Sequence, residues 1–418
     1  MKLRIIAPQS IQPCTIDLPP SKSIANRVLI LSALNGVEPG RVLHQPLSDL
    51  CDDIRVVAEM LQHESVIVDV CAAGTAMRFG TAYLAVCNGT HTITGTQRLQ
   101  ERPIGILVDA LRTLGATIEY MGKEGFPPLR ITGNQSLRGG CLTMNGGVSS
   151  QFISALLMIA PTMQDGLTLK LEGQLVSTPY LYITMELMRK FGASLDWTDQ
   201  RTIRVEHGYN YNPQQAITIE ADWTAASYWY EIASIAGIQP TAFRPQSLIK
   251  DSIQGDRVCD DIFNRLHQQQ AKPVTGSPSN EPELVPKAFT YDFEDCPDLV
   301  QTLVVTCCMN ALPFRFTGLR TLRIKETDRI SALQTELAKM GFGLEATDDS
   351  LTWDGHCEAT KDSFTIATYH DHRMAMSFAP CALRLGEITI EDPSVVNKSY
   401  PTYWSDLEKI GFQLCYIS

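Results

Sequence analysis

Six short polar clusters in this chain lie where helix-like apolar stretches begin, and most contain a lysine, an arginine or a hydroxyl group. The first N–H groups of a helix are unpaired and carry partial positive charge, so a helix start can hold an anion. Several such starts with cationic side chains predict a site for more than one anionic group, which favours phosphorylated or carboxylated small substrates. The clusters are Ser21-Lys22-Ser23, Gly74-Thr75, Ser149-Ser150-Gln151, Cys296-Pro297-Asp298, Lys325-Glu326-Thr327-Asp328-Arg329 and Asp371-His372-Arg373.

Two of these clusters contain carboxylates suited to proton transfer. Lys325 and Arg329 are four residues apart and would share a helix face, where like charges are unfavourable unless an anion lies between them. Glu326 would lie next to both cations, which can hold it ionised, or burial could raise its pKa, and either suits a general acid or base. Asp298 follows Pro297 as the first polar group of an apolar helix. An exposed helix with salt bridges and a solvated acidic loop are the alternative interpretations.

The spacing of His370 and His372 resembles part of a metal site, but the sequence places no third ligand cluster nearby. We therefore expect no metal ion, and expect Arg373 to lie at a helix start with a hydrogen bond from His372. The twelve cysteines contain no CxxC pair and most lie in apolar runs. This usage is typical of buried, reduced thiols in a cytosolic protein.

Composition excludes several classes of partner. The 418 residues are 44% hydrophobic and 19% charged, as in a soluble globular protein of about two domains. The net charge of −11 argues against nucleic acid or an anionic membrane as partner. The N-terminus lacks a signal-like apolar segment, and no apolar run reaches membrane-spanning length. We expect a cytoplasmic protein whose anion site is built locally from clustered cations.

One pattern recurs along the chain, namely a helical stretch, a glycine in the left-handed position after it, and a strand. The glycines of the four clear copies are Gly115, Gly192, Gly341 and Gly411, and weaker copies lie at residues 53–61 and 261–267. Six units of about 70 residues indicate an internal repeat. Three units in each half predict two similar α/β domains with an active site in the cleft that separates them.

Several element boundaries are predicted from caps and breakers. The expectations are a helix from a Ser21 or Ser23 cap to Gly36, helices at Phe152–Ala160, Tyr180–Phe191 and Ala225–Ala236 (capped by Asp222), a strand at Arg320–Ile324 that leads into a helix at Lys325, and a surface loop at Pro273–Pro286.

Taken in order, nine motifs resemble the 5-enolpyruvylshikimate-3-phosphate (EPSP) synthase family over essentially the whole chain. This resemblance implies two domains, residues 1–20 with 221–418 and residues 21–220, each of three βαβαββ units in an inside-out α/β barrel. The motifs are Ser21-Lys-Ser-Ile-Ala-Asn-Arg27, Ala73-Gly-Thr-Ala-Met-Arg78, Glu101-Arg-Pro-Ile-Gly105, Val148-Ser-Ser-Gln-Phe152, Ser177-Thr-Pro-Tyr180, Pro297-Asp298, Ile324-Lys-Glu-Thr-Asp-Arg329, Asp371-His-Arg-Met-Ala-Met376 and Lys398.

The resemblance implies transfer of the carboxyvinyl group of phosphoenolpyruvate to the 5-hydroxyl of shikimate 3-phosphate, with release of phosphate and without metal or organic cofactor. It also implies a monomer. The catalytic residues would be Asp298, Glu326 and Lys22. Phosphoenolpyruvate would be held by Lys22, Gly74, Arg102, Gln151, Arg329, Arg373 and Lys398. Shikimate 3-phosphate would be held by Lys22, Ser23, Arg27, Ser149, Ser150, Gln151, Ser177, Asp298 and Lys325, with Tyr180 close by. Seven cations among these would roughly balance the five to six negative charges of the two substrates.

The sequence departs from the family pattern at three positions. Ala72 stands where the family usually has Asn, Phe79 where Pro is common, and Thr321 where Asn is usual. Because Gly74 remains, we expect inhibition by glyphosate. Two other functions stay open at this point: the related UDP-N-acetylglucosamine enolpyruvyl transferase, although its usual reactive Cys is Gln97 here, and a non-catalytic binder of phosphorylated metabolites.

Overall fold

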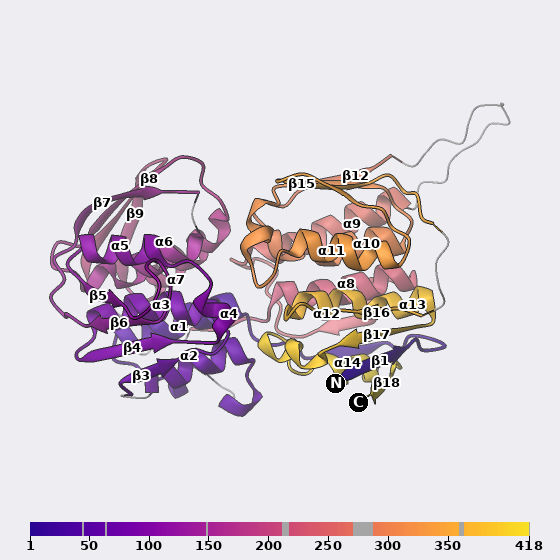
Figure 1. Ribbon diagram of the computed structural model, residues 1–418, viewed down its shortest axis with the longest axis horizontal. Coiled ribbons are helices and arrows are strands. Elements are labelled where there is room, and N and C mark those ends of the chain that lie inside the picture. Colours follow the sequence, from indigo (N-terminus) through magenta and orange to yellow (C-terminus); the bar gives the residue numbers. More distant parts are fainter. Residues whose placement is uncertain are drawn as a thin grey trace. The chain divides into compact units, whose positions relative to one another are not determined.

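The computed structural model describes residues 1–43, 46–62, 65–147, 149–210, 217–270, 287–358 and 363–417. The chain forms two compact units: unit 1 is Met1–Pro19 with Ala221–Ser418, and unit 2 is Pro20–Glu220 (Figure 1). The chain thus begins in unit 1, builds all of unit 2 and then completes unit 1. The loop expected at Pro273–Pro286 lies outside the described residues, as does Val148 of the fourth motif.

Unit 2 contains two four-stranded sheets of the same design. Their strand orders are β3-β4-β6-β5 and β7-β8-β10-β9. In each, the first two strands are parallel and the others are antiparallel. The elements are α1 (Lys22–Leu34), α2 (Asp52–Gln62), β3 (Ile67–Asp69), α3 (Gly74–Val86), β4 (Thr90–Thr94), α4 (Gln97–Gln100), α5 (Gly105–Thr113), β5 (Thr117–Tyr120), β6 (Leu129–Thr132), β7 (Gly140–Asn145), α6 (Ser150–Ile159), β8 (Leu167–Glu172), α7 (Thr178–Lys190), β9 (Ala193–Asp199) and β10 (Thr202–Tyr209).

Unit 1 repeats this design in the sheets β12-β13-β15-β14 and β16-β17-β1-β18, and adds the parallel pair β11-β2. The elements are β1 (Lys2–Ile6), β2 (Cys14–Ile16), α8 (Trp223–Ala236), β11 (Phe243–Pro245), α9 (Cys259–Gln270), β12 (Phe289–Asp292), α10 (Val300–Met309), β13 (Phe314–Thr317), α11 (Arg329–Lys339), β14 (Glu345–Ala346), β15 (Ser350–Trp353), β16 (Thr365–Ile366), α12 (His372–Phe378), α13 (Ala382–Leu385), β17 (Glu387–Glu391), α14 (Tyr403–Lys409) and β18 (Gln413–Ile417).

Each four-stranded sheet is made by one βαβαββ unit, except that the first strand of the chain completes the last unit. β1 lies antiparallel to both β17 and β18, with Ile5 opposite Ile388 on one side and Leu414 on the other. The parallel first pair of each sheet is joined through a helical crossover, as parallel strands require, namely α3, α6, α10, and α12 with α13. The N-terminal strand therefore closes a unit whose remaining elements lie at the other end of the chain.

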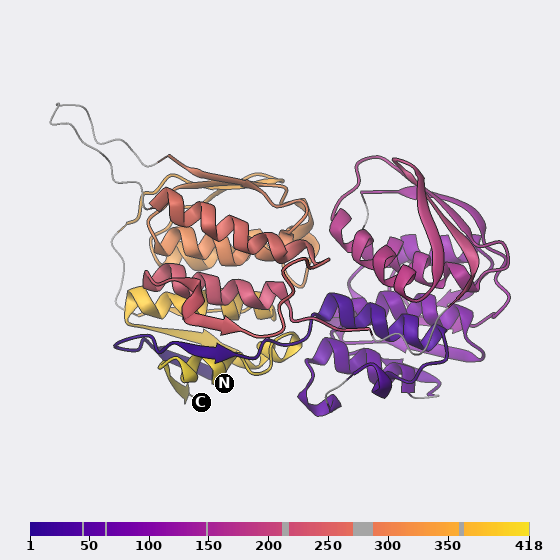
Figure 2. The same cartoon turned by 180° about the vertical axis from the view of Figure 1, so that it is seen from behind.

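Helices lie inside each unit and sheets lie outside, as each unit shows in both views (Figures 1 and 2). All residues of α10 and α12 are buried, as are nine of the ten residues of α6. Helices that are apolar on all sides must be covered on all sides, which explains their interior position. The class predicted from the sequence, an inside-out arrangement of α/β repeats, is confirmed.

The repeat predicted from glycines is present in the structure. Gly115, Gly192, Gly341 and Gly411 all have positive φ and follow the ends of α5, α7, α11 and α14. Helices α2 and α9 occupy the places of the two weaker copies. Asp222 caps α8 by accepting from the N–H groups of Thr224 and Ala225.

One predicted boundary is wrong, and the error changes the site. Arg320–Ile324 forms a 3-10 turn instead of a strand, and α11 begins at Arg329 instead of Lys325. The reason is Asp328, whose carboxylate accepts from the N–H of Ser331 (3.1 Å) and so fixes the helix start four residues later. Lys325 and Arg329 therefore do not share a helix face.

The expectation of buried cysteines holds for only half of them. All twelve are free thiols and six are buried, but Cys71, Cys141, Cys357 and Cys415 are exposed.

Candidate active site

Arg329 is the centre of a charged cluster in unit 1. Its guanidinium is 2% exposed and binds three carboxylates: Nε binds Asp371 at 2.7 Å, Nη1 binds Asp298 at 2.9 Å and Nη2 binds Glu326 at 3.1 Å. The first position of α11 places this side chain, while Asp371 caps α12 and accepts from the N–H of Arg373 (2.9 Å). Both predicted proton-transfer residues are thus held by one guanidinium.

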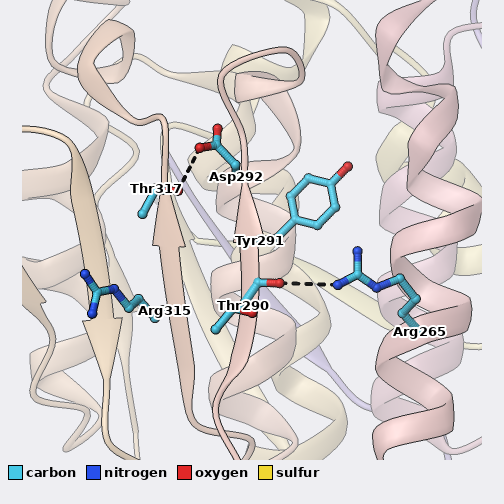
Figure 3. Close-up of a pocket in the computed structure, with 6 residues that line it drawn as sticks. All are labelled: Arg265, Thr290, Tyr291, Asp292, Arg315 and Thr317. Carbon is cyan, nitrogen blue, oxygen red and sulfur yellow. Dashed lines mark hydrogen bonds between the residues drawn. The ribbon is translucent and has the colours of Figure 1, made fainter.

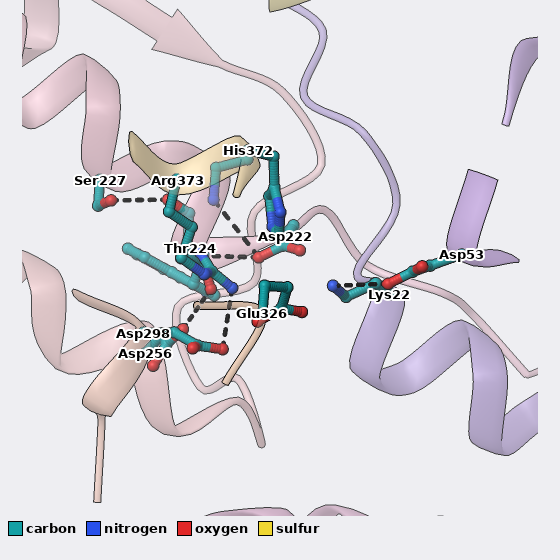
Figure 4. Close-up of polar contacts among 12 residues, drawn as sticks. Lys22, Asp53, Asp222, Thr224, Ser227, Asp256, Asp298, Glu326, His372 and Arg373 are labelled. Carbon is teal, nitrogen blue, oxygen red and sulfur yellow. Dashed lines mark hydrogen bonds and ion pairs between the residues drawn. The ribbon is translucent and has the colours of Figure 1, made fainter. Parts of the chain in front are cut away.

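Two further cations contact the same carboxylates. Arg373 Nη2 lies 2.9 Å from Asp298 (Figure 4). Lys398 Nζ lies 2.9 Å from Glu326. Burial lowers the pKa of Arg373, but the negative charge of Asp298 and the further acidic groups around it together outweigh burial and raise that pKa. The structure therefore brings together the predicted residues Asp298, Glu326, Arg329, Arg373 and Lys398. The carboxylates of this cluster neutralise its cations, and the balance of seven cations against the substrates did not include these carboxylates.

A fourth carboxylate lies beside this cluster and was not predicted from the sequence. Asp256 is buried, accepts a hydrogen bond from the hydroxyl of Thr224, and has its pKa raised to about 7 by burial and by the negative charge of Asp298 (Figure 4). The neighbouring Gln254 fixes the loop by bonding the backbone of Trp223 and Ala221. The only signal in the sequence was an aspartate before a short helix, which is too common to single out.

The central helices of unit 2 begin without a side-chain cap. No side-chain cap hydrogen bond is present at Ser21 before α1, Ala73 before α3 or Ser149 before α6. Ser177, which precedes α7, also makes none and has φ of 54°, in the left-handed region. Backbone N–H groups at uncapped helix starts are suited to hold an anion.

Side chains from these helix starts contact one another within unit 2. Gln151 on α6 donates to the hydroxyl of Thr75 on α3 (3.0 Å). Gly74 lies against two guanidiniums, since a Cβ added there would be 2.7 Å from Arg102 Nη1 and 2.7 Å from Arg78 Nη1. A side chain at this position would therefore displace the two guanidiniums. The predicted residues Gly74, Arg102 and Gln151 lie on neighbouring elements.

Lys22 is paired with a carboxylate that was not predicted. Its ammonium lies 3.0 Å from Asp53, whose side chain is 5% exposed (Figure 4). Asp53 lies in the first turn of α2, where negative charge is favourable. The sequence signal was present in Asp52-Asp53, because acidic residues mark a helix start, but it gave no indication of Lys22 as partner.

Arg27 is held differently from the other cations. It is 2% exposed, and its guanidinium donates to the hydroxyls of Thr184 (2.7 Å) and Ser154 (3.2 Å) and to the carbonyls of Ser23 (2.8 Å) and Tyr180 (3.3 Å). Burial lowers the pKa of Arg27 to about 10. A buried cation with neutral partners remains able to attract an anion.

The remaining predicted residues are on helix starts or turns. Ser150 and Ser177 are buried, Ser23 and Ser149 are half-buried, and Lys325 is half-buried immediately after the 3-10 turn. The four serines belong to unit 2, and Lys325 belongs to unit 1.

Within the described ranges, no group of three or more His, Cys, Asp or Glu side chains could hold a metal ion. No described helix has the length and apolar character needed to cross a membrane. An open depression of about 420 Å³ in unit 1 is lined by Arg265, Thr290, Tyr291, Asp292, Arg315 and Thr317.

This depression does not coincide with the charged cluster. Figure 3 shows the guanidiniums of Arg265 and Arg315 on opposite sides of the two strands, so they do not converge on one ligand. None of the predicted site residues lines it.

The fold defines the class of protein first. Among solved structures, EPSP synthase from Acinetobacter baumannii has a TM-score of 0.72 at 20% identity and covers 100% of both chains. The enolpyruvyl transferase NikO from Streptomyces tendae has a TM-score of 0.62 at 14% identity and covers 100% of this chain and 99% of that one. The fold is that of the enolpyruvyl transferases.

Sequence comparison then defines the family. Residues 48–407 match the family EPSP synthase (3-phosphoshikimate 1-carboxyvinyltransferase). The 3-phosphoshikimate 1-carboxyvinyltransferase of Bacteroides fragilis is 49% identical over 417 residues, which cover 99% of this chain and 98% of that protein. That of Yersinia pestis is 34% identical over 95% of this chain and 96% of its own length. The chain belongs to the EPSP synthase family and is an enolpyruvyl transferase of the shikimate pathway, which excludes the two alternative functions considered above.

Proposed function

We propose that this chain joins phosphoenolpyruvate to shikimate 3-phosphate through the residues named from the sequence, and that its two compact units are the two domains of the family. The observation that carries this assignment is the charged cluster of unit 1, in which Arg329 binds Asp298 and Glu326 while Arg373 and Lys398 each bind one of them. Two carboxylates held among three cations match a reaction that moves protons beside anionic substrates.

The proposed chemistry is an addition followed by an elimination. The 5-hydroxyl oxygen of shikimate 3-phosphate forms a bond to C2 of phosphoenolpyruvate, its proton passes to one carboxylate, and C3 receives a proton. The resulting tetrahedral intermediate then loses phosphate as its C2–O bond breaks, and the methyl group returns a proton. Asp298 and Glu326 divide these transfers, and Lys22 lies beside the reacting groups.

The two substrates use two sets of residues in this proposal, and the sets share Lys22 and Gln151. Shikimate 3-phosphate is held by residues at the starts of α1, α6 and α7 (Lys22, Ser23, Arg27, Ser149, Ser150, Gln151 and Ser177) and by Asp298 and Lys325. Phosphoenolpyruvate is held by Lys22, Gly74, Arg102, Gln151, Arg329, Arg373 and Lys398. The uncapped helix starts of unit 2 and the unneutralised charge of Arg27 support the first set. The approach of Arg102 to Gly74 supports the second.

Phosphate release tests the proposal directly. The purified chain is mixed with phosphoenolpyruvate and shikimate 3-phosphate, and release is expected only when both are present. Release with UDP-N-acetylglucosamine in place of shikimate 3-phosphate, or no release with either acceptor, would contradict it. The same assay tests the proposed inhibition by glyphosate, since unchanged turnover with glyphosate far above the phosphoenolpyruvate concentration would reject it.

The family resemblance also supports a monomer in the cytoplasm, with no metal or organic cofactor. Sedimentation of the purified chain tests the first point, and a single species of 46.3 kDa is expected. Full turnover after treatment with a chelator tests the last.

A further inference from the structure

Two stacks of arginine on phenylalanine link the central helices of unit 2. The guanidinium carbon of Arg27, on α1, lies 5.2 Å from the ring centroid of Phe79, on α3. The guanidinium carbon of Arg78, also on α3, lies 5.4 Å from the ring centroid of Phe152, on α6. These are the three helices whose starts carry the clusters of unit 2. The stacks therefore connect the elements that position those clusters.

The stack under Arg27 differs from the usual environment of a buried cation. Burying a charge is costly unless a partner compensates it, and buried arginines are normally paired with carboxylates. In the part of the chain that the structure describes, Arg27 makes no ion pair, and its four hydrogen-bond acceptors are all neutral. The ring of Phe79, which is 1% exposed, supplies the negative face of an aromatic quadrupole at this desolvated charge.

We infer that Phe79 is a positioning residue for Arg27: its ring stabilises and orients the guanidinium without neutralising it, so that the charge stays available to shikimate 3-phosphate. This inference rests on the proposed role of Arg27 in holding that substrate. A carboxylate at the same place would compete with the anionic substrate for the cation. An aromatic face attracts the cation but carries no net charge, so the substrate completes the charge balance.

The geometry separates the two tasks of the guanidinium. Its N–H groups donate to Thr184, Ser154, Ser23 and Tyr180, while its central carbon lies over the ring of Phe79. The hydrogen bonds fix the direction of the side chain, and the ring lowers the cost of keeping it charged. The family commonly has proline at this position, and a proline ring has no π face.

Fluorination of the ring tests the inference without changing its shape. Phenylalanine with one, two or three ring fluorines is introduced at position 79, because each fluorine weakens the negative face of the ring. Dissociation constants of shikimate 3-phosphate are measured by calorimetry. We expect the logarithm of the dissociation constant to rise in proportion to the number of fluorines. The dissociation constant itself should increase about 10- to 30-fold in total. We expect kcat to change less than about threefold.

A substitution and a matched control complete the design. Phe79→Leu should weaken binding about as much as three fluorines. Phe191→Leu removes the same atoms from another buried site of unit 2 and should leave the dissociation constant within about twofold. An equal loss of affinity in both leucine variants, or a flat fluorine series beside a weakened Phe79→Leu, would show that the ring only fills space, and the inference would be overturned.

A further variant separates this inference from the role on which it rests. Arg27→Gln should weaken binding of shikimate 3-phosphate more than any change at position 79. Unchanged binding in Arg27→Gln would overturn the role of Arg27 itself, whereas weakened binding with a flat fluorine series would overturn only the role of Phe79.

Discussion

The buried arginines of the predicted site are held in different ways in the two units. In unit 1, Arg329, Arg373 and Lys398 are neutralised by Asp298, Glu326 and Asp371. In unit 2, Arg27 has neutral acceptors and an aromatic ring. The helix starts differ in the same sense, because Asp222, Asp328 and Asp371 cap helices of unit 1 while α1, α3 and α6 have no side-chain cap.

This difference between the partners of the cations indicates that anion binding and proton transfer place different demands on a cation. A group that holds an anion must keep its charge available, and a neighbouring carboxylate would reduce that availability. A carboxylate that transfers protons must be held in place and kept in the right state, which adjacent cations achieve. Among the predicted site cations of unit 2, Lys22 differs from Arg27 because Asp53 contacts it, and Lys22 is also the one proposed to act in catalysis.

The largest expected effect tests the proton-transfer role of unit 1. Glu326→Gln should lower kcat by about 10²- to 10⁴-fold, because a general acid–base group is lost while the shape is kept. Phosphate release at saturating substrates measures it. The affinity for shikimate 3-phosphate, measured by calorimetry, should change little. A variant with near-normal kcat would remove Glu326 from the mechanism.

The next effect tests how far unit 1 depends on charge neutralisation. Arg329→Met should destabilise unit 1 by about 3–5 kcal/mol, because three carboxylates lose their shared partner. Urea unfolding followed by tryptophan fluorescence reports on this unit, since four of the five tryptophans lie in it. The control is Arg315→Met, at an exposed position, which should change stability by less than about 0.5 kcal/mol. Equal effects in the two variants would contradict the central role of Arg329.

A buried acid outside the cluster offers a reference for unit 1. Glu231 on α8 is fully buried, neither of its oxygens has a hydrogen-bond partner among the described residues, and burial raises its pKa. The folded state thus keeps a proton that the unfolded state releases above about pH 4.5, so stability should fall by about 1.4 kcal/mol per pH unit as the pH rises from there towards the raised pKa. Glu231→Met should remove this contribution to the slope, while Asp256, whose pKa is raised to about 7, keeps its own contribution below that pH. Urea unfolding at pH 5, 6, 7 and 8 measures the difference between the two proteins. An unchanged slope would place the titrating group elsewhere.

A smaller effect tests the open helix start of unit 2. Gly74→Ala places a methyl group against the guanidiniums of Arg102 and Arg78. Both contacts are with the ends of flexible side chains, so the chain should still fold, but the cations must move. We expect KM for phosphoenolpyruvate to rise about tenfold, which corresponds to about 1.4 kcal/mol, with a smaller change for shikimate 3-phosphate. Initial rates with each substrate varied in turn measure both values, and equal changes would contradict the separate assignment.

The smallest expected change in stability tests the contrast between Arg27 and Arg329. Arg27→Met removes a buried charge that no carboxylate balances, and the saved desolvation cost offsets the four lost hydrogen bonds. Its stability should therefore stay within about 1 kcal/mol of the parent, in contrast to Arg329→Met. Hydrogen exchange of the amides in α6 and α7 reports on unit 2. A loss as large as that of Arg329→Met would show that the two cations do not differ in the proposed way.

Local patterns in the sequence predicted much of the fold. Glycines after four helices marked the repeat, and Asp222 marked the start of α8, because both signals act within a few residues. The predicted helix start at Lys325 was wrong although its signal was also local. Two competing starts lay four residues apart, and Asp328 was the stronger cap.

The residue types of the site, the repeat and, through nine motifs, the family could all be predicted from the amino-acid sequence. Which charges meet could be seen only once the chain was folded. Asp53 with Lys22, Asp256 with Thr224 and Phe79 with Arg27 are pairs separated by 31, 32 and 52 residues. Such contacts depend on how helices pack. The charge of a cation is readable from its residue type, but whether that charge is free for a substrate depends on the groups that packing brings against it.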